Sequence, residues 1–310
     1  MDASYCGDSL LGVCIAIMPI QMVLVAARFY TRHVQHIACT LDDYFIVPAL
    51  IGSLGHSALY IVLLKVGVLG YHLEYVQQTA PEKLVRLREG LFASQIICYP
   101  VIVTFAKLSI LLFYTRIFRT SQFQILSYAV GFIVVGTGIG VLFAAIFQCS
   151  PVPLAWNVSL RGSCINQQAF FRYVSIPQIF TDSVILVMPL PYVWKLHTRL
   201  TNKLALTGVF LLGGLELVAS ILRMTIFFQE EIMTDSTWVS VSLGIWSVLE
   251  GAIIIIAACL PPVWPLFVRF LPEKLVRKTR QTPKDQPQYV TRGNIELKRT
   301  SNGFSWLGDQ

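Results

Sequence analysis

Long apolar stretches with few charges recur along the chain and are separated by short polar segments. A helix rises about 1.5 Å per residue, so about 20 apolar residues are enough to cross the hydrocarbon core of a bilayer. Seven stretches meet this length, at residues 10–29, 44–64, 91–113, 125–147, 174–194, 204–228 and 239–263. The pattern predicts an all-α, polytopic membrane protein, a bundle of seven transmembrane helices in the plasma membrane or an endomembrane.

The segments outside these stretches predict three parts. Residues 1–9 are expected to be a short extracellular or lumenal N-terminus, residues 10–268 the seven-helix transmembrane domain, and residues 269–310 a basic, largely disordered cytoplasmic tail. After residue 263, prolines mixed with basic and polar residues replace the sustained hydrophobicity, a composition that favours disorder. No basic segment precedes the first apolar stretch, so we expect it to be both insertion signal and first span.

The positions of Lys and Arg predict the orientation. No basic residue precedes the first span, whereas Arg28 and Arg32 close its far end, and nine of the 24 basic residues lie between Arg269 and Arg299. Basic residues are enriched on the cytoplasmic side, which predicts the N-terminus outside and the C-terminus inside. The net charge of +7 implies no nucleic acid, because anionic inner-leaflet lipids attract such a tail.

The loop between the fourth and fifth spans has two features of an extracellular or lumenal face. Asn157 begins an Asn-Val-Ser sequon and is the expected glycosylation site. Cys149 and Cys164 bracket the same loop, where an oxidising compartment favours a disulfide. Two unrelated thiols are the alternative.

Ionisable residues inside the predicted spans have complementary signs. Such residues are costly in hydrocarbon and indicate function unless they pair structurally. Depth along the helices predicts that five of them line one polar cavity open to the outer side, namely His56, Asp182, Glu216, Arg223 and Glu250. Three acids facing one Arg leave at least one acid uncompensated, which indicates a bound proton, cation or molecule. Structural pairing of Arg223 with the acids is the alternative.

These residues divide into candidate roles. Asp182, Glu216 and Glu250 are the candidate acid–base groups, while His56, Arg223 and Trp246 are candidate binding residues.

Lys107 lies elsewhere, in the inner half of the third span. Its long stem is expected to reach Asp42 and Asp43 at the inner mouth of the second span, as a structural latch rather than chemistry.

Several familiar functions lack their sequence signals. The last span contains no Lys for a retinal Schiff base, and the third span ends Phe113-Tyr114-Thr115-Arg116, without the acidic-Arg-aromatic triplet of rhodopsin-type G-protein-coupled receptors. Glycine-rich phosphate loops, Cys-x-x-Cys pairs and His-Glu-x-x-His motifs are missing from the sequence. We therefore expect no cofactor and no metal.

Local motifs on nearly every span carry a family resemblance. They are Arg28-Phe29-Tyr30-Thr31-Arg32, Leu41-Asp42-Asp43-Tyr44, Ala106-Lys107-Leu108-Ser109, Phe147-Gln148-Cys149-Ser150-Pro151, Thr181-Asp182, Ala219-Ser220-Ile221-Leu222-Arg223, Trp246 with Glu250, and Cys259-Leu260-Pro261. On these motifs, over roughly residues 28–265, the chain resembles the fungal seven-helix proteins of the rhodopsin-like domain family, also called satratoxin-cluster-type integral membrane proteins.

The resemblance implies one of two functions. Some members look like receptors for external cues, often with a cysteine-rich extracellular domain or a long tail, and others are encoded in secondary-metabolite gene clusters. Here only nine residues precede the first span and they contain a single cysteine, Cys6. This departure from the receptor-like form favours a compact, cluster-associated member.

Two hypotheses follow. The first is an accessory protein of a fungal secondary-metabolite pathway, which binds a lipophilic intermediate or catalyses an acid–base step on it within the bilayer; whether it is an enzyme stays open. The second is a receptor for an extracellular small molecule. Transport has less support, because no inverted repeat is evident. The expected partners are the bilayer and a lipophilic small molecule, and no protein partner is predicted.

Overall fold

The computed structural model of the chain describes residues 5–66, 68–157, 160–195, 200–228, 235–270, 289–291, 296–300 and 303–306. The chain divides into two compact units, Met1–Phe267 and Val268–Gln310. The first unit contains the helical bundle and the second contains a small sheet.

Among the described residues, seven helical segments are long and apolar enough to cross a membrane. They are α1 (Gly7–Val34), α2 (Leu41–Val66), α4 (Pro81–Ala93) continuing through η1 (Ser94–Cys98) into α5 (Tyr99–Ile117), α6 (Ser121–Ile146), α7 (Gln167–Val187), α9 (Leu200–Phe228) and α11 (Ser236–Phe270). Each segment coincides with one predicted span, so the predicted seven-helix fold class is confirmed. In the fifth span, α7 ends at Val187 and the short α8 (Leu190–Lys195) follows.

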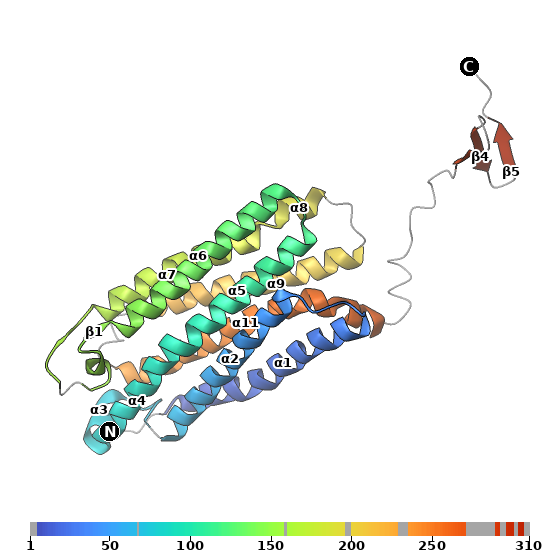
Figure 1. Cartoon of the computed structure of the whole chain (residues 1–310). Coiled ribbons are helices and arrows are strands. Elements are labelled where there is room, and N and C mark those ends of the chain that lie inside the picture. The colour runs from blue at the N-terminus through green and yellow to red at the C-terminus, as the bar shows by residue number, and fades with distance from the viewer. Residues whose placement is uncertain are drawn as a thin grey trace. The chain divides into compact units, whose positions relative to one another are not determined.

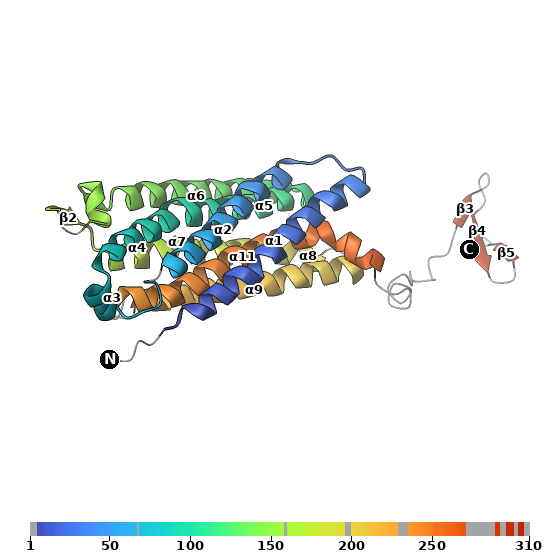
Figure 2. The same cartoon turned by 90° about the horizontal axis from the view of Figure 1, so that it is seen from below.

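The helices pack as a bundle with α5 and α11 toward its centre (Figures 1 and 2). Helix α2 packs against α1 and α5, α6 lies between α5 and α7, and α7 packs against α9. Within the most apolar window of each helix, 61% of α11 is buried but only 22% of α1 or α6. The outer faces of α1 and α6 are therefore available to lipid, while α11 is covered mainly by protein.

The start of α1, the short α3 (Leu73–Thr79) and strand β1 lie at one end of the bundle, and α8 lies at the other (Figures 1 and 2). An odd number of spans places the start of α1 and the end of α11 on opposite sides of a bilayer. Which side is cytoplasmic stays a prediction from the basic residues.

The third span contains a π-helical turn, which is wider than an α-helical turn, between α4 and α5. Helix α4 starts at Pro81, where Pro is favoured because its missing N–H would have no helical partner. Thr79 is the last residue of α3, and its hydroxyl donates to the Tyr75 carbonyl at 2.8 Å instead of capping α4. The π-helical η1 then ends two residues before Pro100, with the Tyr99 N–H bonded to the Ser94 carbonyl. Such turns often mark functional sites.

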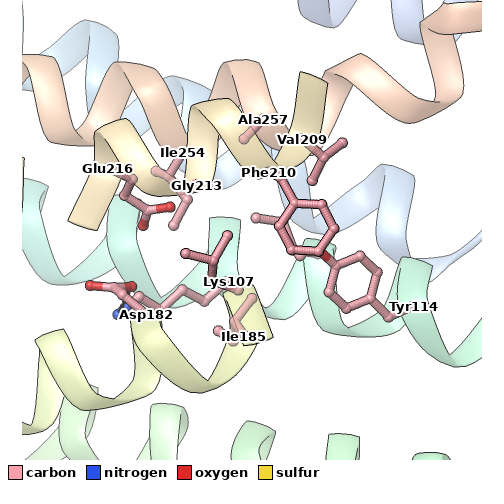
Figure 3. Close-up of a pocket in the computed structure, with 12 residues that line it drawn as sticks. Lys107, Tyr114, Asp182, Ile185, Val209, Phe210, Gly213, Glu216, Ile254 and Ala257 are labelled. Carbon is pink, nitrogen blue, oxygen red and sulfur yellow. Dashed lines mark ion pairs between the residues drawn. The ribbon is translucent and has the colours of Figure 1, made fainter. Parts of the chain in front are cut away.

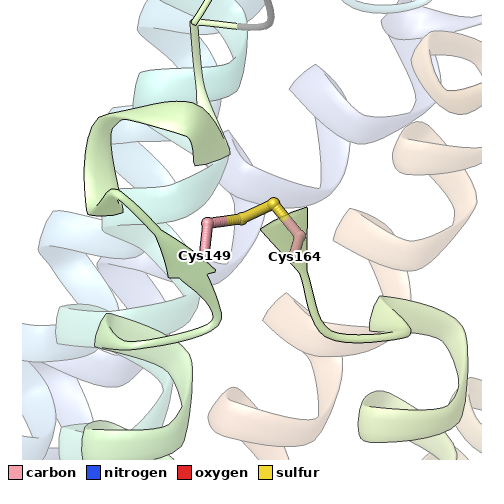
Figure 4. The surroundings of a disulfide bond; sticks show 2 residues. All are labelled: Cys149 and Cys164. Atoms are coloured by element: carbon pink, nitrogen blue, oxygen red, sulfur yellow. A yellow bond between two sulfur atoms is a disulfide. The ribbon is translucent and has the colours of Figure 1, made fainter. Parts of the chain in front are cut away.

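The predicted disulfide between Cys149 and Cys164 is confirmed (Figure 4). The two residues are paired in a short antiparallel ladder between β1 (Cys149–Ser150) and β2 (Ser163–Cys164), with the 3₁₀ turn η2 (Val152–Ala155) between the strands. The bond closes the loop that joins α6 to α7. Asn157 lies in this loop, but Val158 and Ser159 of its sequon fall outside the described residues, and its glycosylation stays a prediction.

A buried ion pair joins the first two helices at the end opposite the disulfide. The Arg28 guanidinium lies 2.7 Å from Asp42 Oδ2 and 2.8 Å from Asp43 Oδ1, and all three side chains are almost completely buried. Arg32, one turn further, approaches the same two carboxylates at 3.2 and 3.0 Å. Two cations therefore face two acids, and the charges balance without water.

The same guanidinium also holds α11. Arg28 Nη1 donates to the Ala258 carbonyl at 2.6 Å. That carbonyl would normally accept from the N–H four residues later, but residue 262 is Pro and has none. Arg28 thus satisfies a backbone group that a proline leaves unpaired within the membrane.

The predicted latch between Lys107 and these aspartates is wrong. Arg28 and Arg32 occupy Asp42 and Asp43, and the Lys107 ammonium points instead to Asp182 of α7, 2.6 Å from its Oδ1. The sequence gives the depth of Lys107 along α5. It does not give the direction in which the side chain points around the helix axis.

At the other end, a polar contact ties α3 to α11. Asp235, directly before α11, accepts hydrogen bonds from His72 Nδ1 and from the Leu73 N–H, and the His72 ring stacks on Trp238 with centroids 4.2 Å apart. Burial raises the pKa of Asp235, but these hydrogen bonds outweigh it and hold the pKa below its ordinary value.

The second unit contains a three-stranded antiparallel sheet in the order β3 (Tyr289–Thr291), β4 (Glu296–Thr300) and β5 (Gly303–Trp306). The sequence predicted little order here. Most of the remaining tail lies outside the described residues, and its predicted disorder stays a prediction.

Replacing Arg28 with Ala is expected to destabilise the bundle by about 3–5 kcal/mol, because it leaves two buried carboxylates with less compensation and the Ala258 carbonyl unpaired. Thermal unfolding in lipid nanodiscs measures the effect. The control is Arg119→Ala at an exposed position, which should change stability by no more than about 0.5 kcal/mol. Equal unfolding of the two variants would contradict the assignment.

Asp235→Asn is expected to lower the melting temperature at pH 7. Because the folded-state pKa of Asp235 is depressed, its stabilising contribution is complete above the unfolded-state pKa and is lost as pH falls through the folded-state value. The difference from wild type should therefore hold from pH 7 to about pH 5 and shrink as the pH falls from about 5 to about 2. Asp8→Asn, at an exposed carboxyl, is the control. A difference that stays constant over this range would refute the pH dependence.

Candidate functional site

Buried ionisable side chains of α5, α7 and α9 meet at the middle of the bundle. The Lys107 ammonium, paired with Asp182, also donates to Thr181 Oγ1 at 2.9 Å and to the Gln178 carbonyl at 3.2 Å. An ammonium has three donors, so each has a partner and the charge needs no water.

Glu216 of α9 is hydrogen-bonded to Asp182 across the gap between α9 and α7 (Figure 3). An ionised carboxylate only accepts hydrogen bonds, so a bond between two carboxyl groups requires a proton on one of them. A small residue permits this approach, since a Cβ at Gly213 would lie 2.7 Å from Leu186 of α7. One proton on the pair would complete a hydrogen bond between the two carboxyl groups.

These three ionisable residues line a cavity that we call the inner cavity. Tyr114 lines it too, and most of the remaining wall is apolar, formed by Ile110, Ile185, Leu186, Val209, Phe210 and Ile254 (Figure 3). Its empty volume of about 400 Å³ includes space that is open to the surroundings. The arrangement places two neighbouring acids in a mostly apolar wall.

A second cavity, the outer cavity, lies nearer the disulfide end of the bundle. Its empty volume is about 570 Å³, again partly open, and its polar lining residues are His56, Ser94, Gln95, Tyr99, Ser175, Arg223 and Ser247. His56 is almost fully buried: its Nε2 lies 3.3 Å from Ser94 Oγ and its ring stacks on Tyr60. Its Nδ1 has no hydrogen-bond partner among the described residues.

Arg223 of α9 is held between the two cavities. Its Nε lies 3.0 Å from Glu250 Oε2, its Nη2 donates to Gln178 Oε1 at 2.8 Å, and its guanidinium carbon lies 4.3 Å from the centre of the Tyr99 ring. The Tyr99 hydroxyl donates to Glu250 at 3.0 Å. The π turn before Pro100 gives Tyr99 its position. Glu250 already compensates the positive charge of Arg223, so this guanidinium is not free to bind a further anion.

Ser220 joins the two groups of charges. Its hydroxyl is hydrogen-bonded to Glu250 Oε1 and lies 3.4 Å from Asp182 Oδ2. On α9, Glu216, Ser220 and Arg223 are spaced by four and three residues, which places them on one face. The polar side chains thus form one continuous cluster, in which Lys107 and Arg223 face Asp182, Glu216 and Glu250.

The structure brings together most of the predicted site residues but divides the predicted single cavity in two. His56 and Arg223 line the outer cavity, whereas Asp182 and Glu216 line the inner one. Glu250 lines neither and connects them through its partners. Trp246 is half-buried on α11 and also lines neither.

Sequence reasoning missed four members of the cluster: Tyr99, Lys107, Gln178 and Ser220. For Lys107 a signal existed, because a charged side chain inside a span needs a partner there, but the partners predicted for it were Asp42 and Asp43. The neutral side chains give no such signal, since Ser, Gln and Tyr are common in membrane helices for many reasons.

The fungal rhodopsin domain matches residues 27–269 of this chain. Among curated relatives, the polyenoic acids biosynthesis gene cluster protein Ba17b of Metarhizium anisopliae is 32% identical over 80% of this chain and 70% of its own length. Receptor GIN3 of Arthrobotrys oligospora is 26% identical over 58% of this chain and 44% of its own. Satratoxin biosynthesis SC1 cluster protein 4 of Stachybotrys chartarum is 26% identical over 53% and 59%. No solved structure matches.

The match covers the end of α1, the other six spans and both cavities, and two of these relatives are named for biosynthetic gene clusters. The chain is thus a fungal multi-pass membrane protein that belongs to the fungal rhodopsin domain family.

Proposed function

We propose that this protein takes a lipophilic intermediate of a secondary-metabolite pathway into the inner cavity and transfers a proton to it there. The observation that carries the proposal is that the Asp182 and Glu216 carboxyl groups face each other in the wall of a mostly apolar cavity (Figure 3). Two buried carboxyl groups this close favour a proton on one of them, and a protonated acid in an apolar wall supports proton transfer to a weakly basic group.

The proposed chemistry needs only a proton donor and a fixed counter-charge. Glu216 gives the proton to an alkene or an epoxide of the intermediate, and the cation that forms later returns a proton to the same carboxylate. Lys107 supplies the counter-charge and holds Asp182 in place during this exchange, 2.6 Å away. General acid catalysis of this kind contributes about 10²–10⁴-fold to a rate.

The relatives support the pathway assignment. Ba17b and the satratoxin cluster protein are named for biosynthetic gene clusters in two fungi, and the first is the more similar to this chain. Their names do not state an activity, so the reaction at the inner cavity rests on the geometry alone.

A receptor is the second candidate, favoured by the outer cavity and by the likeness to Receptor GIN3. It predicts that an external small molecule changes an interaction at the inner face. Arg223→Ala, tested by co-purification of inner-face partners with and without added extract, should abolish that change while the protein stays in the membrane. If no extract alters any partner interaction of the wild type, the receptor reading fails.

Deleting the gene in the source fungus is expected to remove or replace a metabolite in mass-spectrometric profiles. Complementation with the wild type should restore it, whereas Glu216→Gln should restore less than about one hundredth, because the amide cannot supply the proton. Glu89→Gln, at an exposed carboxyl of α4, is the matched control and should restore it fully. An unchanged profile after deletion would refute the pathway role, and full restoration by Glu216→Gln would refute the proton transfer.

A further inference from the structure

We infer that Tyr99, Glu250 and Ser220 form a proton relay that connects the outer cavity with the acid pair of the inner cavity. Its role in first loading the acid pair with a proton rests on the proposed function, but the relay itself is a property of the side chains. Two cavities lie at the two ends of one hydrogen-bonded chain, and its middle members line neither cavity.

Each step of the chain is short. The Tyr99 hydroxyl, in the wall of the outer cavity, lies 3.0 Å from Glu250 Oε2. The other oxygen of Glu250 accepts from the Ser220 hydroxyl, which lies 3.4 Å from Asp182 Oδ2. Asp182 is bonded to Glu216 in the wall of the inner cavity. The described residues thus leave no gap that water must bridge.

The charges make a proton available to this chain. Lys107 and Arg223 compensate two of the three carboxylates, so the cluster becomes neutral by holding one proton. Ser220 lies between two carboxyl groups and has a single proton, which it can donate to only one of them at a time. A bridging hydroxyl of this kind transfers a proton without itself gaining or losing charge.

In one passage, Tyr99 accepts a proton from a donor in the outer cavity as its own moves to Glu250 Oε2. The protonated Glu250 carboxyl group then rotates about its terminal bond, which brings the proton to the oxygen beside Ser220, and the Ser220 hydroxyl rotates toward Asp182. The Ser220 oxygen accepts the proton from Glu250 while its original proton moves to Asp182 Oδ2. Both hydroxyls and the Glu250 carboxylate are regenerated, and the net change is one proton carried from the outer cavity to Asp182.

The outer cavity contains a residue suited to exchange protons with its contents. His56 is 2% exposed, lines the cavity, and has an Nδ1 without a partner among the described residues. A buried imidazole nitrogen with no protein partner is costly unless a cavity molecule satisfies it. Such a molecule, water being the simplest, would connect His56 with the cavity opening.

Infrared spectroscopy of the full chain in lipid nanodiscs tests the relay without a substrate. The C=O stretching band of a protonated carboxylic acid is expected in the wild type, and Glu216→Gln should remove or shift it. On transfer into D₂O the band shifts as the proton exchanges. Ser220→Ala should slow this exchange by about tenfold or more, the effect of about 1.4 kcal/mol on the transfer barrier, and Tyr99→Phe should slow it similarly.

Two matched variants separate the relay from a general change in packing. Ser220→Thr retains the hydroxyl and should exchange as fast as the wild type, and Ser242→Ala removes an exposed hydroxyl on α11 and should have no effect. Wild-type exchange in Ser220→Ala, or the absence of a protonated carboxyl band, would overturn the relay. Slow exchange in Ser220→Ala together with full metabolite restoration by Glu216→Gln would overturn the proposed function and leave the relay standing.

Discussion

The buried charges that the structure describes in this bundle are compensated within the protein, and this constraint organises the structure. The Arg28 guanidinium shows it most completely, because it neutralises Asp42 and Asp43 and also accommodates the Ala258 carbonyl that Pro262 leaves free. One side chain of α1 thereby fixes α2 and α11 together. In hydrocarbon an unpaired carboxylate or carbonyl would cost several kcal/mol, so the mutual position of these three helices follows from satisfying them.

The same constraint has a different result at the middle of the bundle. There two cations meet three acids, so one acid is left without a cation. The ion pair at the end opposite the disulfide is therefore closed, while the central cluster has one acid that a proton would neutralise. The Arg28 group has as many cations as acids and holds three helices together. The central cluster has one more acid than it has cations, and this excess is what the proposed proton transfer depends on.

The polar cluster adjoins two cavities with different linings. This difference is relevant to whether the protein acts in a pathway or as a receptor. The inner cavity has two acids in a mostly apolar wall. The outer cavity has several hydrogen-bonding groups and an Arg whose charge is already paired with a carboxylate. The curated relatives are named for both roles. A shared scaffold is compatible with either, since a family defined by its helices and charges need not share one ligand.

The sequence alone determined the seven spans and the position of each charge along its helix, because hydrophobicity and position along a helix are local properties. It predicted the disulfide between Cys149 and Cys164 but left two unrelated thiols as the alternative. It did not determine which charges meet. Lys107 was expected at Asp42 and Asp43 but lies against Asp182, and the single predicted cavity is two, with Ser220 between them. Partner choice depends on how each helix is rotated and how closely it approaches its neighbours, as at Gly213. Only the packed bundle fixes those angles and distances.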